Sequence, residues 1–138
     1  MTAPHVLFVC VKNGGKSQMA AGLMRQVVRD AGTGTTVDSA GTKAGTTLNA
    51  QSVESLRELG VDISDQVPRQ LTEQMVRDAD LVVVLGSEAR VESVGGTPVE
   101  VWETDEPSRR GIEGADRMRL VRDDIAARVQ ELHQRLSR

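Results

Sequence analysis

The chain has 138 residues, a length that fits a single domain over residues 1–138 and leaves little room for a second. Its net charge is −3, which argues against a general nucleic-acid binder, and the aromatic residues are only Phe8 and Trp102, too few for stacking nucleobases. The longest apolar run, residues 6–11, is far shorter than a membrane span, and no signal peptide is visible at the N-terminus. We therefore expect a cytoplasmic protein without a membrane or nucleic-acid partner.

Four apolar runs predict β-strands, at His5–Cys10, Thr36–Ala40, Leu81–Leu85 and Val99–Trp102. The continuous Val and Leu character of the first and third is typical of strands that are covered on both faces, as in a parallel sheet. Strands of this kind need helices on both sides.

Helical periodicity fills the gaps between the strands. It predicts helices over Ser17–Asp30, Asn49–Leu59, Thr72–Asp78 and Arg117–Leu136, with Asn49 and Thr72 as N-caps and Gly60 as a stop. The order β-α-β-α-α-β-β-α predicts an α/β fold, an open, mostly parallel four-stranded sheet with helices on both faces. In such a sheet ligands bind outside the carboxyl ends of the strands, so we expect the chemistry in segments 11–16, 41–47, 86–88 and 103–108.

The segment between the first strand and the first helix reads Cys-Val-Lys-Asn-Gly-Gly-Lys-Ser, residues 10–17. Its glycines allow main-chain N–H groups to turn toward one point, at a helix N-terminus where the dipole favours negative charge. One lysine adds a cation and another assists from the rim. We therefore expect an oxyanion to bind to the segment formed by Val11, Lys12, Asn13, Gly14, Gly15 and Lys16.

Cys10 lies at the mouth of this segment, where positive surroundings stabilise a thiolate. Ser17 can donate its hydroxyl to that thiolate, and Asn13 suits a left-handed backbone position from which its side chain holds the loop. A lone Cys at the end of an apolar strand is more often a plain core residue. The glycines, the cation and the strand–helix context together favour a catalytic thiolate instead.

The spacing of the residues argues against a nucleotide-binding P-loop and against a metal site. Gly15-Lys16-Ser17 matches the end of a nucleotide-binding P-loop, but the first glycine of G-x-x-x-x-G-K-[ST] would fall on Cys10. His5 and His133, the latter on an expected surface helix, have no ligand partner at a suitable spacing, so we expect no metal site.

The loop resembles the C-x(5)-R-S loop of the low-molecular-weight protein tyrosine phosphatases and of the arsenate reductases that share their fold. Further matches follow in the same order along nearly the whole chain. Residues 17–20 (Ser-Gln-Met-Ala) are similar to the continuation R-S-Q-M-A-E, residues 39–42 (Ser-Ala-Gly-Thr) to S-A-G-T, and Glu106-Pro107 after Trp102 to the acid-Pro segment. The resemblance implies a flavodoxin-like three-layer sandwich.

Three departures from the family pattern narrow what the resemblance implies. Lys16 stands where the family has Arg, and it offers an oxyanion a point charge rather than two parallel donors. Residues 85–87 (Leu-Gly-Ser) stand where the thioredoxin-linked arsenate reductases carry the first of two further cysteines, so an intramolecular disulfide relay is impossible. The aromatic walls that hold a phosphotyrosine ring are missing, apart from Trp102.

The sequence is most similar to the single-cysteine arsenate–mycothiol transferases, whose loops resemble C-V-x-N-G-G-K-S. The resemblance implies arsenate detoxification: arsenate is joined to the thiol co-substrate mycothiol, and a separate mycoredoxin reduces the adduct to arsenite. The alternative is a phosphomonoester hydrolase like the low-molecular-weight phosphatases, and a non-catalytic oxyanion sensor is a third reading.

The resemblance also implies catalytic roles for Cys10, Lys16 and Ser17. Either Cys10 attacks arsenic or it polarises the site while mycothiol attacks. A general acid would be Glu106 by position before Pro, or Asp105 by residue type. The remaining charges fit solvated faces, namely Asp123, Asp124, Arg109, Arg110, Arg117, Arg119 and Arg122, although Arg109 and Arg110 could contact a thiol or a partner.

Overall fold

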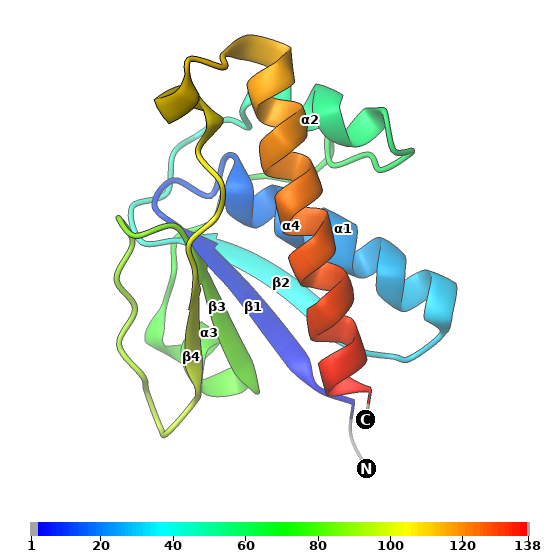
Figure 1. The fold of residues 1–138 in the computed structure, drawn as a ribbon. Helices are drawn as coiled ribbons and strands as arrows, with labels where there is room; N and C mark the ends of the chain where they lie inside the picture. The colour runs from blue at the N-terminus through cyan, green and yellow to red at the C-terminus, as the bar shows by residue number, and fades with distance from the viewer. Residues whose placement is uncertain (1–2, 138) are drawn as a thin grey trace.

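The computed structural model describes residues 3–137 (Figure 1). Its elements, in chain order, are β1 (His5–Cys10), α1 (Lys16–Ala31), β2 (Thr36–Gly41), α2 (Ala50–Arg57), α3 (Glu73–Asp78), β3 (Leu81–Leu85), β4 (Val99–Trp102), the 3-10 helix η1 (Pro107–Arg110) and α4 (Gly114–Leu136). The predicted order of strands and helices is confirmed. The helix η1 is an addition that the periodicity did not predict, because a single turn is too short to show a period.

The strands form one parallel sheet in the order β2-β1-β3-β4. β1 is an interior strand and pairs with β2 from His5 opposite Thr36 to Cys10 opposite Gly41. Because all neighbours are parallel, the carboxyl ends of the strands meet at one edge of the sheet. The predicted four-stranded parallel sheet is confirmed.

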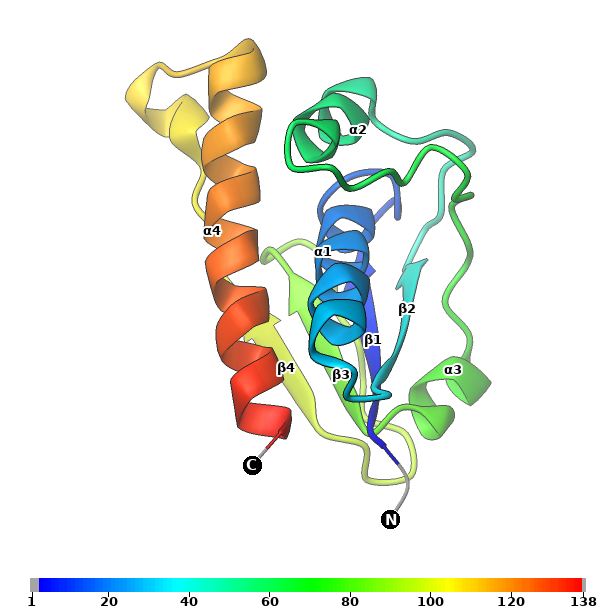
Figure 2. The same ribbon diagram turned by 90° about the vertical axis from the view of Figure 1, so that its right-hand side faces the viewer.

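Helices cover both faces of this sheet (Figures 1 and 2). Successive side chains of a strand point to opposite faces. Val6 and Phe8 accordingly pack into the core beneath α1, α2 and α4, whereas Leu7 and Val9 pack into the core beneath α3. All four are at most 1% exposed, and burial of such a side chain contributes about 1.5–3 kcal/mol. The expected three-layer sandwich is confirmed.

Local signals set the helix ends. The Asn49 side chain accepts a hydrogen bond from the Ser52 N–H at 2.9 Å, and Thr72 Oγ1 accepts one from the Met75 N–H at 3.2 Å, so both predicted N-caps are confirmed. α4 begins earlier than predicted, at Gly114, and α2 ends earlier, at Arg57. Within residues 3–137 no helix combines the length and the apolar character needed to cross a membrane.

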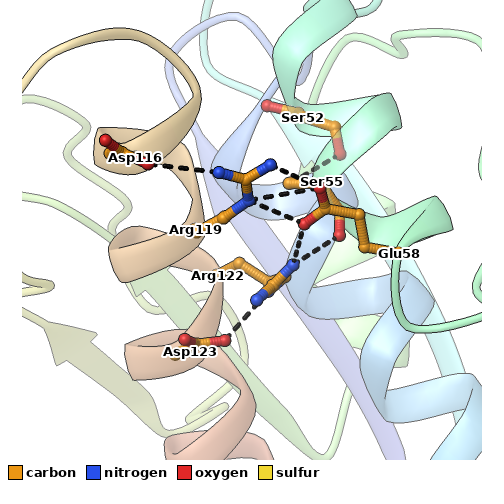
Figure 3. A network of polar contacts seen from close by, with 7 residues as sticks. All are labelled: Ser52, Ser55, Glu58, Asp116, Arg119, Arg122 and Asp123. Atoms are coloured by element: carbon orange, nitrogen blue, oxygen red, sulfur yellow. Dashed lines mark hydrogen bonds and ion pairs between the residues drawn. The ribbon is translucent and has the colours of Figure 1, made fainter.

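A network of ion pairs joins α4 to the end of α2 (Figure 3). Glu58 accepts hydrogen bonds from Arg119 Nη2 at 2.8 Å and from Arg122 Nη1 at 2.7 Å. Arg122 Nη1 also donates to the Ser55 carbonyl at 2.9 Å, and Arg122 is only 8% exposed. The expectation that Arg122 lies on a solvated face was therefore wrong, because α2 covers its guanidinium.

Two further polar side chains of α4 are tied to other segments. His133 lies on a helix with an exposed face, as expected, but its side chain is buried at 8% exposure and its Nε2 lies 2.9 Å from Thr33 Oγ1. Asp124 accepts a hydrogen bond from the Asp105 N–H at 2.6 Å, so it is a structural contact rather than part of a solvated face. Periodicity within one helix does not reveal partners from a distant loop.

The Glu58 network predicts a stability that depends on pH. Hydrogen bonds from Arg119 and Arg122 lower the pKa of Glu58 from 4.5 to about 2. A carboxyl group whose pKa is depressed by folding stabilises the fold fully above its unfolded pKa, and this contribution is lost as the pH falls through the folded value. We expect Glu58→Gln to lower Tm at pH 7, and the difference from the parent protein to shrink as the pH falls from about 4.5 to 2.

Thermal unfolding followed by circular dichroism across this range measures the effect. Glu54→Gln is the matched control, because Glu54 makes an exposed pair with Arg57 on α2 alone. A Tm difference for Glu58→Gln that stays constant with pH would contradict the account.

Candidate active site

The segment Val11–Gly15 leaves the carboxyl end of β1 and leads into α1, and Cys10 is the last residue of β1. The loops that follow the other three strands surround it. This edge is where open parallel sheets bind ligands, as the sequence predicted.

The carbonyl groups of this segment point outward. Four of them accept hydrogen bonds from main-chain N–H groups of the loop after β2: Cys10 from Thr42, Val11 from Lys43, Lys12 from Gly45 and Gly14 from Asn49. The other two accept from α1: Asn13 from the side-chain Nε2 of Gln18, and Gly15 from the Met19 N–H. The peptide bonds of the described residues are trans, and a trans peptide directs its N–H away from its carbonyl. The six N–H groups of residues 11–16 therefore face the inside of the loop. One of them, that of Asn13, donates to Cys10 Sγ at 3.3 Å. A ring of inward N–H groups at a helix N-terminus suits a tetrahedral anion.

Asn13 holds the loop in shape. Its φ is 56°, which confirms the predicted left-handed conformation, and the residue is fully buried. Its Oδ1 accepts hydrogen bonds from the Arg69 N–H at 2.9 Å and from Gln18 Nε2 at 3.1 Å, and its Nδ2 donates to Ser17 Oγ at 2.7 Å. This backbone conformation costs about 1–3 kcal/mol, which the three side-chain hydrogen bonds offset.

Ser17 and Cys10 are in direct contact, with Sγ and Oγ 2.9 Å apart. When Cys10 is a thiolate, its sulfur can only accept, so the Ser17 hydroxyl is then the donor in this contact. Cys10 is half-buried and receives two donors, the Ser17 hydroxyl and the Asn13 N–H. Two donors stabilise negative charge on the sulfur.

Two glycines let neighbouring backbone approach the loop. A Cβ on Gly41 would lie 2.6 Å from the Val11 carbonyl oxygen, and a Cβ on Gly14 would lie 2.9 Å from the Thr47 carbonyl oxygen. Both neighbours are backbone atoms that cannot rotate away. The outward hydrogen bonds of the loop therefore require glycine at these positions.

Residues 103–106 after β4, here called the acidic loop, face the segment of residues 11–16, here called the cradle. Lys16 meets this acidic loop at the mouth of the cradle. Its Nζ lies 3.7 Å from Glu106 Oε2, while Arg117 Nε donates to Glu106 Oε1 at 2.9 Å. The Ser108 hydroxyl adds a third contact at 2.8 Å. Together these groups, led by the Arg117 hydrogen bond, lower the pKa of Glu106 to about 2, so Glu106 is ionised at neutral pH.

Asp105 is held in a different way. Arg110 grips both of its carboxylate oxygens, at 2.8 and 3.0 Å, and lowers the pKa of the group. A general acid must hold a proton at the working pH. With both carboxyls ionised, neither Asp105 nor Glu106 carries that proton in this arrangement, so the assignment of the acid stays a prediction.

Lys16 and Arg117 line two adjoining hollows. A hollow of about 920 Å³ lies among the loops after β1 and β2, α2 and α4, and none of the described residues that line it is acidic. A second hollow of about 860 Å³ contains Cys10, residues 85–88 and the acidic loop. A substrate reaches the Cys10 sulfur through this second hollow.

Trp102 does not line the site. It is 5% exposed, and its ring centre lies 5.7 Å from that of Phe8 in the core. The expectation that Trp102 serves as an aromatic wall was wrong, because the alternation of β4 turns its side chain beneath the helices. With no Tyr in the chain and Phe8 buried, an aryl substrate finds no aromatic partner here.

Sequence reasoning missed three groups at the site. The first is Gln18, which is buried and donates hydrogen bonds to Asn13. The second is the main-chain N–H of Arg69, before α3, which also donates to the Asn13 side chain. The third is Arg117, whose side chain is only 27% exposed and pairs with Glu106. Gln18 had a signal in the Ser-Gln-Met-Ala string. A main-chain donor such as that of Arg69 leaves no trace in a sequence, and Arg117 was wrongly expected on a solvated face because its partner comes from another segment.

The close approach at Gly41 gives a prediction. We expect Gly41→Ala to lower the free energy of unfolding by about 1–3 kcal/mol, the usual cost of overpacking, and to slow alkylation of Cys10 by iodoacetamide at neutral pH. Gly45→Ala is the control, because a Cβ there meets its nearest neighbours at an ordinary 3.8 Å. Denaturant unfolding and mass spectrometry measure the two effects. Equal behaviour of the two variants would contradict the tight packing described above.

Comparisons with known proteins identify the family of this chain. Residues 5–138 match the family model described as low molecular weight phosphotyrosine protein phosphatase. An arsenate reductase of Staphylococcus aureus is 30% identical over 98% of this chain and 100% of its own length, and an arsenate reductase of Bacillus subtilis is 33% identical over 91% and 92%.

Two solved structures extend the comparison. The thioredoxin-dependent arsenate reductase of Corynebacterium glutamicum superposes with a TM-score of 0.79 at 32% identity, and the match covers 99% of this chain but 63% of that one. A tyrosine phosphatase of Erwinia amylovora superposes with a TM-score of 0.82 at 25% identity, over 100% of this chain and 95% of its own. The fold and the family match agree, and the chain belongs to the low-molecular-weight phosphotyrosine protein phosphatase family.

Proposed function

We propose that this protein is an arsenate reductase of the single-cysteine type, an arsenate–mycothiol transferase. One observation carries the proposal: six consecutive carbonyl groups point outward, which turns the N–H groups of residues 11–16 toward the inside of the loop, beside a half-buried thiol in a chain that has no second cysteine. The relatives named arsenate reductases, at about 30% identity over nearly the whole chain, support the choice of arsenate as the substrate.

Arsenate is a tetrahedral oxyanion, and the cradle offers it N–H donors, the N-terminus of α1 and the Lys16 ammonium. These groups neutralise negative charge without a metal ligand. Lys16 provides a point charge, so the ring of N–H groups supplies most of the directional contacts.

The source of electrons follows from the cysteine count. Reduction of arsenate to arsenite takes two electrons, and one cysteine cannot supply them by forming an internal disulfide. Gly86 and Ser87 line the hollow in the region where thioredoxin-linked relatives would carry a further cysteine. An external thiol therefore completes the reaction, and the similarity of the loop to C-V-x-N-G-G-K-S selects mycothiol with mycoredoxin.

In the proposed sequence the Cys10 thiolate attacks arsenic, a sulfur–arsenic bond forms, and a hydroxyl leaves as water. Asp105 or Glu106, which both line the hollow that contains Cys10, delivers the proton for that water. Because both carboxyls are ionised before the substrate binds, the one that acts must first take up this proton from solvent. The mycothiol thiolate then attacks arsenic and releases the Cys10 thiolate, which Ser17 stabilises. Mycoredoxin finally attacks the mycothiol sulfur, so the sulfur–arsenic electron pair passes to arsenic and arsenite leaves with a mixed disulfide on the partner.

A phosphomonoester hydrolase is the second candidate, because the tyrosine phosphatase of Erwinia amylovora shares the fold over 95% of its own length. Two features weigh against it. Lys16 replaces the two-pronged donor of an arginine, and the buried Trp102 leaves the cleft without an aromatic wall.

The direct test is arsenite production from arsenate by the purified protein. We expect turnover with mycothiol plus mycoredoxin, little with glutathione plus glutaredoxin or with thioredoxin, and loss of turnover in Cys10→Ser. If Cys10→Ser keeps a substantial rate, mycothiol attacks arsenic directly and Cys10 only polarises the site. Absence of arsenite in every arm would refute the proposal.

The phosphatase alternative has its own test. We expect the parent protein to hydrolyse p-nitrophenyl phosphate poorly and Lys16→Arg to raise kcat/KM about tenfold or more, since a bidentate charge-assisted contact adds about 1.5–3 kcal/mol. Lys43→Arg is the matched control, because Lys43 is exposed and does not line the hollow that contains Cys10. Efficient, Cys10-dependent hydrolysis by the parent protein would favour the phosphatase instead.

A further inference from the structure

We infer that Arg117 is an oxyanion-binding residue of this site and that Glu106 is a resident anion, which the substrate displaces from Arg117 and Lys16. The inference rests on the proposed function in one respect, namely that the loop formed by residues 11–16 binds arsenate or phosphate.

Glu106 is held by two cations, one at each carboxylate oxygen. Its two carboxylate oxygens face two different cations, Arg117 on α4 and Lys16 on α1. An oxyanion at the mouth of the cradle presents the same feature, two negatively charged oxygens a short distance apart. Glu106 therefore occupies the contacts that a bound anion would otherwise make.

Arg117 lies between the two hollows of the site. Together with Val11, Lys12 and Lys16, it lines both hollows, so it borders the space in front of the cradle from the side of α4. Lys16 alone is a point charge, whereas a guanidinium offers several donors in a fixed plane. Arg117 brings to the site, from a different element, the kind of donor that the loop itself lacks.

Arg117 belongs to α4, a helix that is packed in place. Arg119 and Arg122, which follow it on α4, bind Glu58 at the end of α2 (Figure 3). This network holds the beginning of α4 against α2. Arg117 is thus positioned by packed helices rather than by a loop that must be ordered on binding, which favours affinity.

Displacement has a consequence for Glu106. Its pKa of about 2 depends chiefly on the hydrogen bond from Arg117. Once an oxyanion takes over Arg117 and Lys16, the pKa of Glu106 rises toward its ordinary value, and a neighbouring anion raises it further. Substrate binding thereby prepares Glu106 to take up the proton that the proposed reaction needs.

The test is isothermal titration calorimetry with inorganic arsenate and inorganic phosphate, without any thiol. We expect Arg117→Gln to weaken binding about tenfold or more, Arg117→Lys to recover part of the loss, and Glu106→Gln to tighten binding several-fold. In the double variant Arg117→Gln/Glu106→Gln the gain from Glu106→Gln should shrink, because the two side chains share one contact. In turnover, Glu106→Gln should lower KM for arsenate and kcat together.

Arg135→Gln is the matched control. Arg135 also lies on α4 and pairs with a glutamate, Glu100, at 2.9 Å, but it lines neither hollow. Thermal unfolding checks that each variant is folded. Equal affinities of Arg117→Gln and Arg135→Gln, or weaker binding by Glu106→Gln, would overturn the inference, whereas failure of the parent protein to bind either anion would overturn the proposed oxyanion site itself.

Discussion

The outward hydrogen bonds of six consecutive carbonyl groups, from Cys10 to Gly15, shape this site. They fix the orientation of the peptide planes, and so they direct the N–H groups of residues 11–16 inward. The remaining features follow from this constraint. Gly41 must lack a side chain because the loop after β2 comes close enough to donate to the loop, and Asn13 must adopt a left-handed conformation to close the ring.

Charge is arranged around this ring in an uneven way. The hollow beside the loops after β1 and β2 is lined by cations without acidic neighbours among its described residues, whereas the hollow beside Cys10 mixes carboxylates and arginines. Glu106 lines the second hollow and neutralises Lys16 and Arg117, which line both. The site thus carries its own counter-anion, which keeps two cations partly buried at little cost while no substrate is bound.

Most of the fold was predictable because its signals are local. The apolar strands, the caps Asn49 and Thr72 and the glycine-rich loop each depend on neighbouring residues, and Cys10, Ser17 and Asn13 lie together as expected. The misjudged residues, among them Arg117, Arg122 and Trp102, owe their places to contacts across long separations in the chain. A sequence shows that a side chain is charged or apolar, but only the packing of α4 on α2 and the sheet decides what it meets.

If the inward N–H groups of residues 11–16 bind a tetrahedral oxyanion, arsenate must change their chemical environment. A titration of ¹⁵N-labelled protein with arsenate, followed by ¹H–¹⁵N correlation spectra, measures this change. We expect the amide signals of residues 11–16 to shift together along one saturable curve, with little change in the core of the sheet. Unchanged loop signals, or shifts confined to exposed lysines elsewhere, would contradict it.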